Sequence, residues 1–137
     1  MLQLNGQKLF KRKEFKMRQN ALWNAKNPNQ GKFLKILCLC SAGLLRSPTI
    51  AWVLTRESDH NCRAAGIHDF ALIQCDEVLL EWADLIICSN TDVLFTLVTK
   101  YNPKKDMIDL EIPDQYNYRD PELIEIIRTK LKEEELI

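Results

Sequence analysis

The sequence lacks the long apolar runs that would mark a membrane or secreted protein. No stretch of the 137 residues is apolar over the length that crosses a bilayer. The basic N-terminus lacks the apolar core of a secretion signal. These absences predict a cytoplasmic protein without a membrane partner, and the length fits one domain with an apolar core.

The sequence also lacks the spacings that metal sites require. No two cysteines have the C-x-x-C spacing of a zinc site, and His60 and His68 lie far from any ligand pattern. The number of cysteines is odd and thiols stay reduced in the cytosol, so a disulfide framework is not expected. We therefore predict no metal and no cofactor. The cysteines are Cys38, Cys40, Cys62, Cys75 and Cys88.

Charge divides the chain into two regions, although the net charge is zero. Residues 1–35 contain nine Lys and Arg against one Glu, and the remainder contains ten against eighteen Asp and Glu. Residues 27–31, Asn-Pro-Asn-Gln-Gly, are typical of a turn or linker. The pattern predicts a basic extension over residues 1–31 and a folded domain over residues 32–137. The extension is either a solvated tail or an arm that binds an acidic partner.

Short apolar runs alternate with helical patterns from residue 33 onward. Strands are expected over residues 33–39, 62–65, 85–88 and 107–112, and helices begin near residues 48, 76, 91 and 121, the first with Ser47 as its N-cap. This alternation predicts an α/β fold, a four-stranded parallel sheet with helices on both faces. In such folds ligands bind beyond the carboxyl ends of the strands. The loops after residues 39, 88 and 112 should therefore share one edge of the sheet.

The loop between the first strand and the first helix has the residues of an anion site. In order, it contains Cys40, Ser41, Ala42, Gly43, Leu44, Leu45, Arg46 and Ser47. The backbone N–H groups of such a loop converge on one anion, aided by the positive end of the helix dipole. Arg46 can bind two phosphate oxygens with its planar guanidinium. We therefore predict that residues 41–47 bind phosphate.

The same loop suits a cysteine nucleophile. Donors that bind phosphate also stabilise a thiolate at Cys40, and the Ser47 hydroxyl is a further donor. Gly43 adopts the positive φ that a loop wrapped around phosphate needs. A chance pairing of Cys40 with Arg46 is the alternative. The position of the pair between a buried strand and a helix start favours catalysis.

The loop resembles that of the low-molecular-weight protein tyrosine phosphatase family, in which Cys-x5-Arg-Ser follows the first strand. Residues 112–124, with Ile112-Pro113-Asp114 and Asp120-Pro121-Glu122, are similar to a compact bacterial or phage branch of that family. Trp82-Ala83-Asp84 is similar to that branch as well. The resemblance covers about residues 33–131. It implies a hydrolase that acts on phosphotyrosine proteins or small aryl phosphates through a phosphocysteine intermediate.

Two aspartates are candidates for the general acid that protonates the leaving group. Asp114 directly follows the fourth strand and matches the family's acid position. Asp120 is explained as a helix cap, so we favour Asp114. The resemblance also implies that Tyr116 and Tyr118 line an aryl pocket, with ordinary loop packing as the alternative. Asn90 is placed at the same edge of the sheet.

The loop departs from the family pattern at several positions. Ala42 and Gly43 stand where Gly-Asn is frequent, and Leu45 replaces a cysteine that often protects the nucleophile. Leu44 stands where threonine marks phosphoarginine phosphatases, which favours aryl phosphates. Two other functions remain open. One is a phosphopeptide-binding module without turnover, and the other is a thiol-coupled arsenate reductase, for which nothing after Cys88 supplies the two further cysteines.

Overall fold

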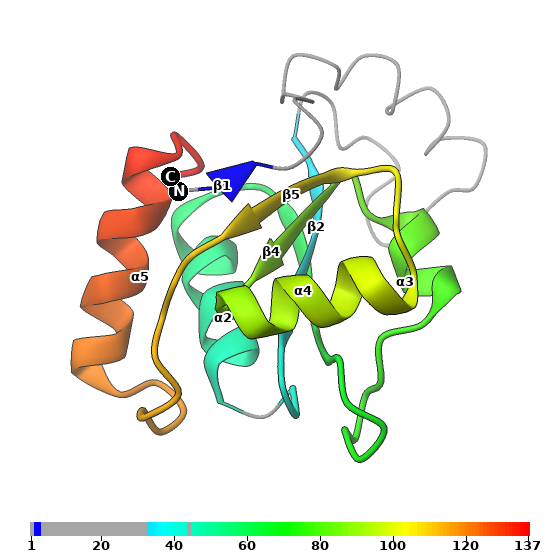
Figure 1. Cartoon of the computed structure of the whole chain (residues 1–137). Helices are drawn as coiled ribbons and strands as arrows, with labels where there is room; N and C mark the ends of the chain where they lie inside the picture. Colours follow the sequence, from blue (N-terminus) through cyan, green and yellow to red (C-terminus); the bar gives the residue numbers. More distant parts are fainter. Residues whose placement is uncertain (1, 4–32, 44) are drawn as a thin grey trace.

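The computed structural model describes residues 2–3, 33–43 and 45–137. Leu44 and most of the predicted basic extension, including its proposed arm, lie outside these residues. The elements are β1 (Leu2–Gln3), β2 (Lys35–Cys40), α2 (Arg46–Glu57), β3 (Asn61–Gly66), α3 (Glu77–Trp82), β4 (Leu85–Cys88), α4 (Thr91–Lys100), β5 (Asp106–Asp109) and α5 (Pro121–Glu133). Figure 1 shows strands and helices alternating along the chain, as the sequence predicts.

The four strands β2 to β5 form the predicted parallel sheet. The order is β1-β5-β4-β2-β3, and β2 pairs in parallel with both β3 and β4, as β4 does with β5. The short strand β1 pairs antiparallel with β5 at the sheet edge. The predicted α/β fold with four parallel strands is therefore confirmed, and β1 is an addition that the sequence pattern did not indicate.

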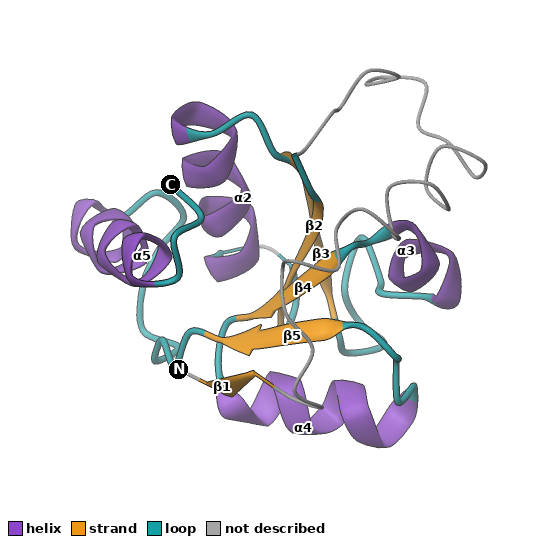
Figure 2. Ribbon diagram, turned by 90° about the horizontal axis from the view of Figure 1, so that it is seen from above, coloured by secondary structure: helices purple, strands orange, loops and turns teal. Residues whose placement is uncertain are grey.

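Helices cover both faces of the sheet, with α2 and α5 on one face and α3 and α4 on the other (Figure 2). Along β2 the side chains alternate between the two layers. Ile36 and Cys38 pack in the core beneath α2 and α5, and Leu37 and Leu39 pack in the core beneath α3 and α4. Because both faces are buried, the strand is a continuous apolar run in the sequence.

The parallel register brings the strand ends to one edge. Leu39 pairs with Cys88, and Cys88 pairs with Asp109, so the loops after β2, β4 and β5 leave the sheet together at its lower edge in Figure 1. The fourth strand ends earlier than predicted. Its last residue, Asp109, accepts the N–H of Glu111 on its side chain, and Glu111 has a φ of +54°. Leu110 and Ile112 still donate to the carbonyls of Cys88 and Ser89 beyond that point.

The first helix also begins differently from the prediction. Its N-cap is Leu45, which makes no side-chain cap, and Ser47 lies inside the first turn. The Ser47 hydroxyl instead contacts the Cys40 sulfur and the Ala65 carbonyl. The prediction of Ser47 as the cap was wrong because the hydroxyl is used toward the strand-end loop.

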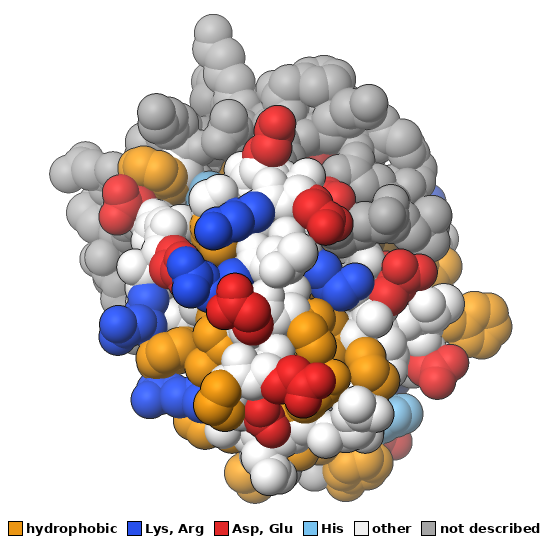
Figure 3. Space-filling model, turned by 90° about the vertical axis from the view of Figure 1, so that its left-hand side faces the viewer, with side chains coloured by type: hydrophobic (Ala, Val, Ile, Leu, Met, Phe, Trp, Pro, Cys, Tyr) orange, Lys and Arg blue, Asp and Glu red, His pale blue; other side chains and the backbone are white. Residues whose placement is uncertain are grey.

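The surface on the α5 side carries acidic and basic side chains interspersed, with apolar side chains gathered toward the strand ends (Figure 3). None of the described helices has the length and apolarity needed to span a membrane.

Candidate active site

Cys40 is the last residue of β2, and its side chain is buried at the carboxyl edge of the sheet. Its sulfur accepts the N–H of Gly43 at 3.2 Å and lies 3.1 Å from the Ser47 Oγ. The Ser47 Oγ is also within 3.2 Å of the Ala65 carbonyl. A hydroxyl has one proton, so Ser47 donates to Ala65 when Cys40 is a thiol. It can turn that proton to the sulfur when Cys40 is a thiolate.

Two glycines let the loop between β2 and α2, called the phosphate loop below, pack against the end of β3. Gly43 has a φ of +74°, and a Cβ on it would lie 2.7 Å from the Gly66 nitrogen. A Cβ on Gly66 would lie 2.5 Å from the backbone of Ala42. The loop is therefore shaped by a backbone-to-backbone contact that no side chain permits. Gly66 was not singled out by the sequence, since its φ is ordinary and its contact is with a distant segment.

Arg46 crosses from the phosphate loop to the loop after β5. Its side chain is buried, and Nη1 donates to the Ile112 carbonyl at 3.0 Å. Its Nη2 donates to the Ser41 Oγ at 3.4 Å, and its Nε lies 3.5 Å from the Asp114 carboxylate. The guanidinium is thus oriented by three partners on two loops. Its location beside Cys40 suits a ligand with several anionic oxygens.

The two aspartate candidates have different surroundings. Asp114 is brought to Arg46, and its side chain is 61% exposed, so a substrate oxygen has access to it. Asp120 is the N-cap of α5 and accepts the Glu122 N–H at 2.9 Å. The cap that the sequence suggested for Asp120 is present. The ion pair places Asp114, rather than Asp120, beside the candidate nucleophile loop.

The three predicted pocket residues are not gathered in one place. Tyr116 is buried in the core beneath α2 and α5 and receives a hydrogen bond from Gln115 on its hydroxyl. Tyr118 is exposed and accepts a hydrogen bond from the Arg119 Nε at 2.9 Å. Asn90 caps α4 by accepting the Val93 N–H at 3.0 Å. Of the three, Tyr118 alone is exposed.

A second wall of the site comes from the loop after β3. The N–H of His68 donates to the Ser41 carbonyl at 3.1 Å, and the His68 ring stacks on Phe70 with 5.3 Å between centroids. Phe70 and Leu72 are exposed. This loop therefore puts apolar surface next to the phosphate loop. The sequence pattern did not indicate it, because the loop has no motif of its own.

Thr49 joins the two functional loops and was missed by sequence reasoning. It is fully buried on α2, and its hydroxyl donates to the Leu45 carbonyl at 2.7 Å. The same oxygen accepts the N–H of Arg119, 70 positions away, at 3.0 Å. Ser89, at the end of β4, is a second missed hydroxyl, fully buried and without a hydrogen-bond partner among the described residues.

The remaining cysteines are held as neutral thiols. Burial raises the pKa of Cys62 and of Cys75 to about 12. Burial also raises the pKa of Cys38 and of Cys88 well above the ordinary value. In the part of the chain that the structure describes, Cys40 alone has a sulfur that accepts a backbone N–H. It is therefore the candidate nucleophile among the five.

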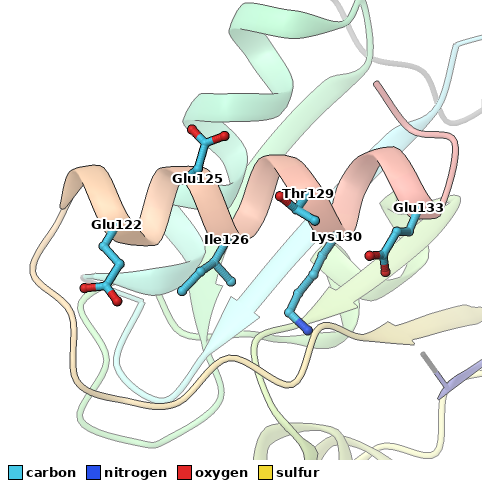
Figure 4. Close-up of a pocket in the computed structure, with 6 residues that line it drawn as sticks. All are labelled: Glu122, Glu125, Ile126, Thr129, Lys130 and Glu133. Atoms are coloured by element: carbon cyan, nitrogen blue, oxygen red, sulfur yellow. The ribbon is translucent and has the colours of Figure 1, made fainter.

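One hollow in the surface lies away from this site, along the outer face of α5. It is lined by Glu122, Glu125, Ile126, Thr129, Lys130 and Glu133 (Figure 4). Glu122, Ile126 and Lys130 point to one side of the helix and Glu125 to the other. Three carboxylates repel a phosphate group, so the hollow does not suit the ligand that the strand-end loop suits. Within the described residues, no cluster of His, Cys, Asp and Glu can hold a metal ion.

Sequence comparisons give no relative, since no protein-family model and no curated protein match the chain. Comparison of structures does find similar proteins. The low-molecular-weight protein tyrosine phosphatase from T. tengcongensis aligns with a TM-score of 0.58 at 15% identity, over 75% of this chain and 96% of that one. Wzb from Vibrio vulnificus, solved in complex with benzylphosphonate, aligns with a TM-score of 0.56 at 18% identity, over 75% and 95%.

A third similar structure is the YwlE arginine phosphatase from Geobacillus stearothermophilus, with a TM-score of 0.53 at 17% identity over 74% of this chain and 86% of that one. At these identities the likeness concerns the fold. The resemblance that the Cys40 loop carries in the sequence is thus matched by the arrangement of strands and helices around it. The chain has the fold of the low-molecular-weight protein tyrosine phosphatases.

Proposed function

We propose that this protein is a metal-independent phosphatase that hydrolyses aryl phosphate monoesters, phosphotyrosine in proteins included, through a phosphocysteine at Cys40. The observation that carries the proposal is the pairing of Arg46 with Asp114 at 3.5 Å. Arg46 belongs to the loop that holds the nucleophile, and Asp114 belongs to the loop after β5. This ion pair therefore brings the proposed proton donor to the proposed anion binder, which directly follows the loop that begins at Cys40.

In the first step the Cys40 sulfur attacks phosphorus in line, forming the S–P bond as the bond to the aryl oxygen breaks. Asp114, in its carboxylic acid form, gives its proton to the departing oxygen, which leaves as a neutral phenol. The amides of residues 41–47 and the Arg46 guanidinium hold the equatorial oxygens, where charge accumulates in the transition state. Ser47 turns its proton to the sulfur while it carries charge.

In the second step a water molecule attacks phosphorus. Asp114, now a carboxylate, takes the proton of that water, and the S–P bond breaks to return the Cys40 thiolate. Inorganic phosphate is released. The same carboxyl thus acts as acid and then as base, which its exposed position beside Arg46 allows.

The surroundings favour an aryl phosphate. Tyr118 and Phe70 are exposed aromatic side chains on the two loops that flank the phosphate loop. Exposed aromatic side chains on loops that contact a phosphate loop are able to stack on a planar phenyl group. Leu44 is apolar at the position where the resembled phosphoarginine phosphatases have a threonine.

An arsenate reductase on this fold needs a relay of reactive thiols. The raised pKa of Cys62 and of Cys75, each about 12, leaves both as unreactive thiols near neutral pH. A module that binds phosphopeptides without turnover would have no use for a carboxylate beside Arg46, because it repels the phosphate. Both alternatives are therefore less well supported than hydrolysis.

The test is hydrolysis of p-nitrophenyl phosphate in the presence of EDTA by the full chain and by Cys40→Ser. We expect turnover by the wild type and a loss of at least about 10³-fold in the variant. Circular dichroism of the variant shows that the fold is retained, since serine is close to cysteine in size. Equal activity of the two proteins would exclude Cys40 as nucleophile. Binding of vanadate without any hydrolysis by the wild type would favour the binding module.

A further inference from the structure

The guanidinium of Arg119 lies in an aromatic stack on the surface. It is 4.4 Å from the centroid of the Trp52 ring and 5.0 Å from that of Tyr118, and its Nε donates to the Tyr118 hydroxyl at 2.9 Å. The residue is exposed. Stacking between two rings fixes the plane of the guanidinium while leaving both terminal NH2 groups free to donate.

The backbone of Arg119 is fixed as well. Its φ of +57° is in the left-handed region, and its N–H donates to the buried Thr49 hydroxyl at 3.0 Å. The residue is therefore anchored to the first turn of α2, one residue ahead of the cap of α5. An exposed arginine held by both its backbone and its side chain loses little entropy when it binds a ligand.

A second cation shares the same ring. The guanidinium of Arg56, one turn further along α2, lies 4.8 Å from the Trp52 centroid. Neither Arg56 nor Arg119 makes an ion pair within the residues that the structure describes. The carboxylates next to them in the sequence have other partners, since Asp120 caps α5 and Glu57 pairs with Arg128 at 2.9 Å. Two like charges at one ring form a local cationic surface that attracts an anion.

The distance between the phosphate loop and the surface formed by Arg56, Trp52 and Arg119 determines which residue of a bound peptide can contact that surface. Trp52 follows Arg46 by six positions on α2, which places it about 9 Å further along the helix axis at about 1.5 Å per residue. An extended peptide advances about 3.3 Å per residue. A side chain that reaches this surface therefore belongs to a residue about three positions from the one whose phosphate lies at Cys40.

We propose that Arg119, together with Arg56, binds an acidic side chain two or three residues from phosphotyrosine in a protein substrate. The proposal rests on the proposed function and narrows its substrate class to phosphotyrosine in an acidic segment. Residues of the phosphate loop carry out the hydrolysis, and the Trp52–Arg119–Tyr118 cluster makes hydrolysis faster for peptides with an acidic residue near the phosphotyrosine.

The test compares two phosphotyrosine peptides. One carries Glu at the second and third positions on both sides of the phosphotyrosine, and the other carries Gln at the same positions. For the full-length wild type we expect kcat/KM to be about fivefold higher for the Glu peptide, the upper range for an exposed ion pair. Arg119→Gln is expected to lower that ratio to about two, because Arg56 remains, and the double variant Arg56→Gln/Arg119→Gln to lower it to about one. Arg63→Gln is the matched control, because Arg63 also stacks on a tryptophan, Trp82, at 4.6 Å, but from β3. It should keep the wild-type ratio.

The ratio of the two peptides is the readout, so a general loss of activity does not affect the result. In the wild type the ratio should also fall as KCl is raised, because exposed charges are screened, and this measurement needs no variant. Equal rates for the two peptides in the wild type, or a preference as large in Arg119→Gln as in the wild type, would overturn the proposal. Peptide hydrolysis without selectivity would leave the phosphatase function standing. Absence of aryl phosphate hydrolysis would remove that function itself.

Discussion

The phosphate loop and the loop after β5 carry the two halves of the proposed chemistry, and they are held in different ways. In the phosphate loop, Cys40 and Arg46 are 3% and 2% exposed, and their partners include the loop's own N–H and hydroxyl groups. In the loop after β5, the Asp114 side chain is 61% exposed and its ion pair is with Arg46. The anion site is preorganised, whereas the position of the acid depends on contacts supplied by another segment.

Two bridges join these loops. Arg46 reaches across to the Ile112 carbonyl and to Asp114, and Thr49 accepts the N–H of Arg119. Both bridges start from the first turn of α2, the helix that closes the phosphate loop. The loop after β5 is therefore held to the first turn of α2 at both Ile112–Asp114 and Arg119. Changes in either loop, or in the bridges, separate these contributions.

The largest effect is expected from the acid. Asp114→Asn removes the proton without changing the side-chain size, so hydrolysis of phenyl phosphate should fall about 10³-fold. With p-nitrophenyl phosphate the loss should be smaller, since that leaving group departs without a proton. Asp120→Asn is the control, because asparagine caps a helix as well as aspartate does. Steady-state kinetics with both esters measure the difference, and a larger loss in Asp120→Asn would assign the acid to that residue.

A smaller effect is expected from the shape of the phosphate loop. Gly43→Ala places a Cβ within 2.7 Å of the Gly66 nitrogen at a φ of +74°. The loop amides must shift, and a displacement on that scale lowers kcat by about 10²-fold. Vanadate affinity, measured by inhibition of the same reaction, should weaken together with kcat. A variant that turns over slowly but binds vanadate as the wild type does would contradict a role in shaping the anion site.

The bridge at Thr49 should have a more moderate effect. Thr49→Val keeps the shape but leaves the partly buried Arg119 N–H without its acceptor, and we expect kcat for phenyl phosphate to fall about tenfold. Thr55→Val is the matched control. Thr55 also donates to the carbonyl four residues earlier at 2.7 Å on the same helix, but it is exposed and accepts no backbone N–H.

The bridge has a signature beyond a lower rate. If Thr49 positions the loop after β5, Thr49→Val should make kcat depend more strongly on the pKa of the leaving group. Thr49→Ser, which keeps the hydroxyl, should show the same dependence as the wild type. Stopped assays with a series of substituted phenyl phosphates measure this dependence. An equal effect of Thr49→Val on all esters, or an equal effect of Thr55→Val, would show that Thr49 only stabilises the helix.

The smallest effect concerns stability in alkali rather than turnover. Burial raises the pKa of Cys62 and Cys75 from the ordinary 9.0 to about 12. The unfolded chain ionises these thiols near pH 9.0 while the folded chain does not, so their stability contribution is present below pH 9.0 and is lost as the pH rises toward 12. Urea unfolding midpoints at pH 8 and at about pH 10 measure the loss. If the midpoint falls between these two pH values by the same amount in Cys62→Ala as in the wild type, the contribution assigned to Cys62 is contradicted.

The sequence indicated those features that depend on neighbouring residues. The Cys40 to Arg46 spacing, the buried run of β2 and the Asp114 position after β5 are all local patterns. In the structure β2 is buried and Asp114 lies 3.5 Å from Arg46, and the catalytic roles of these residues stay predictions. The fold followed from the alternation of apolar runs with helical patterns.

The features that the sequence did not indicate depend on contacts between distant segments. The bridge from Thr49 to Arg119 joins residues 70 positions apart, and the contact of Gly43 with Gly66 joins a loop to another strand. Ser47 was assigned as a cap because serine before proline usually is one. The buried sulfur and carbonyl that bind its hydroxyl instead lie on β2 and β3.

The most direct test is to capture the intermediate. The wild type is mixed with radiolabelled aryl phosphate, denatured within milliseconds, digested, and the labelled peptide is identified by mass spectrometry. We predict a phosphoryl group on Cys40, absent in Cys40→Ser and accumulating in Asp114→Asn with a good leaving group, because the water then lacks its base. Turnover without a labelled Cys40, or a label on another residue, would contradict nucleophilic catalysis by Cys40.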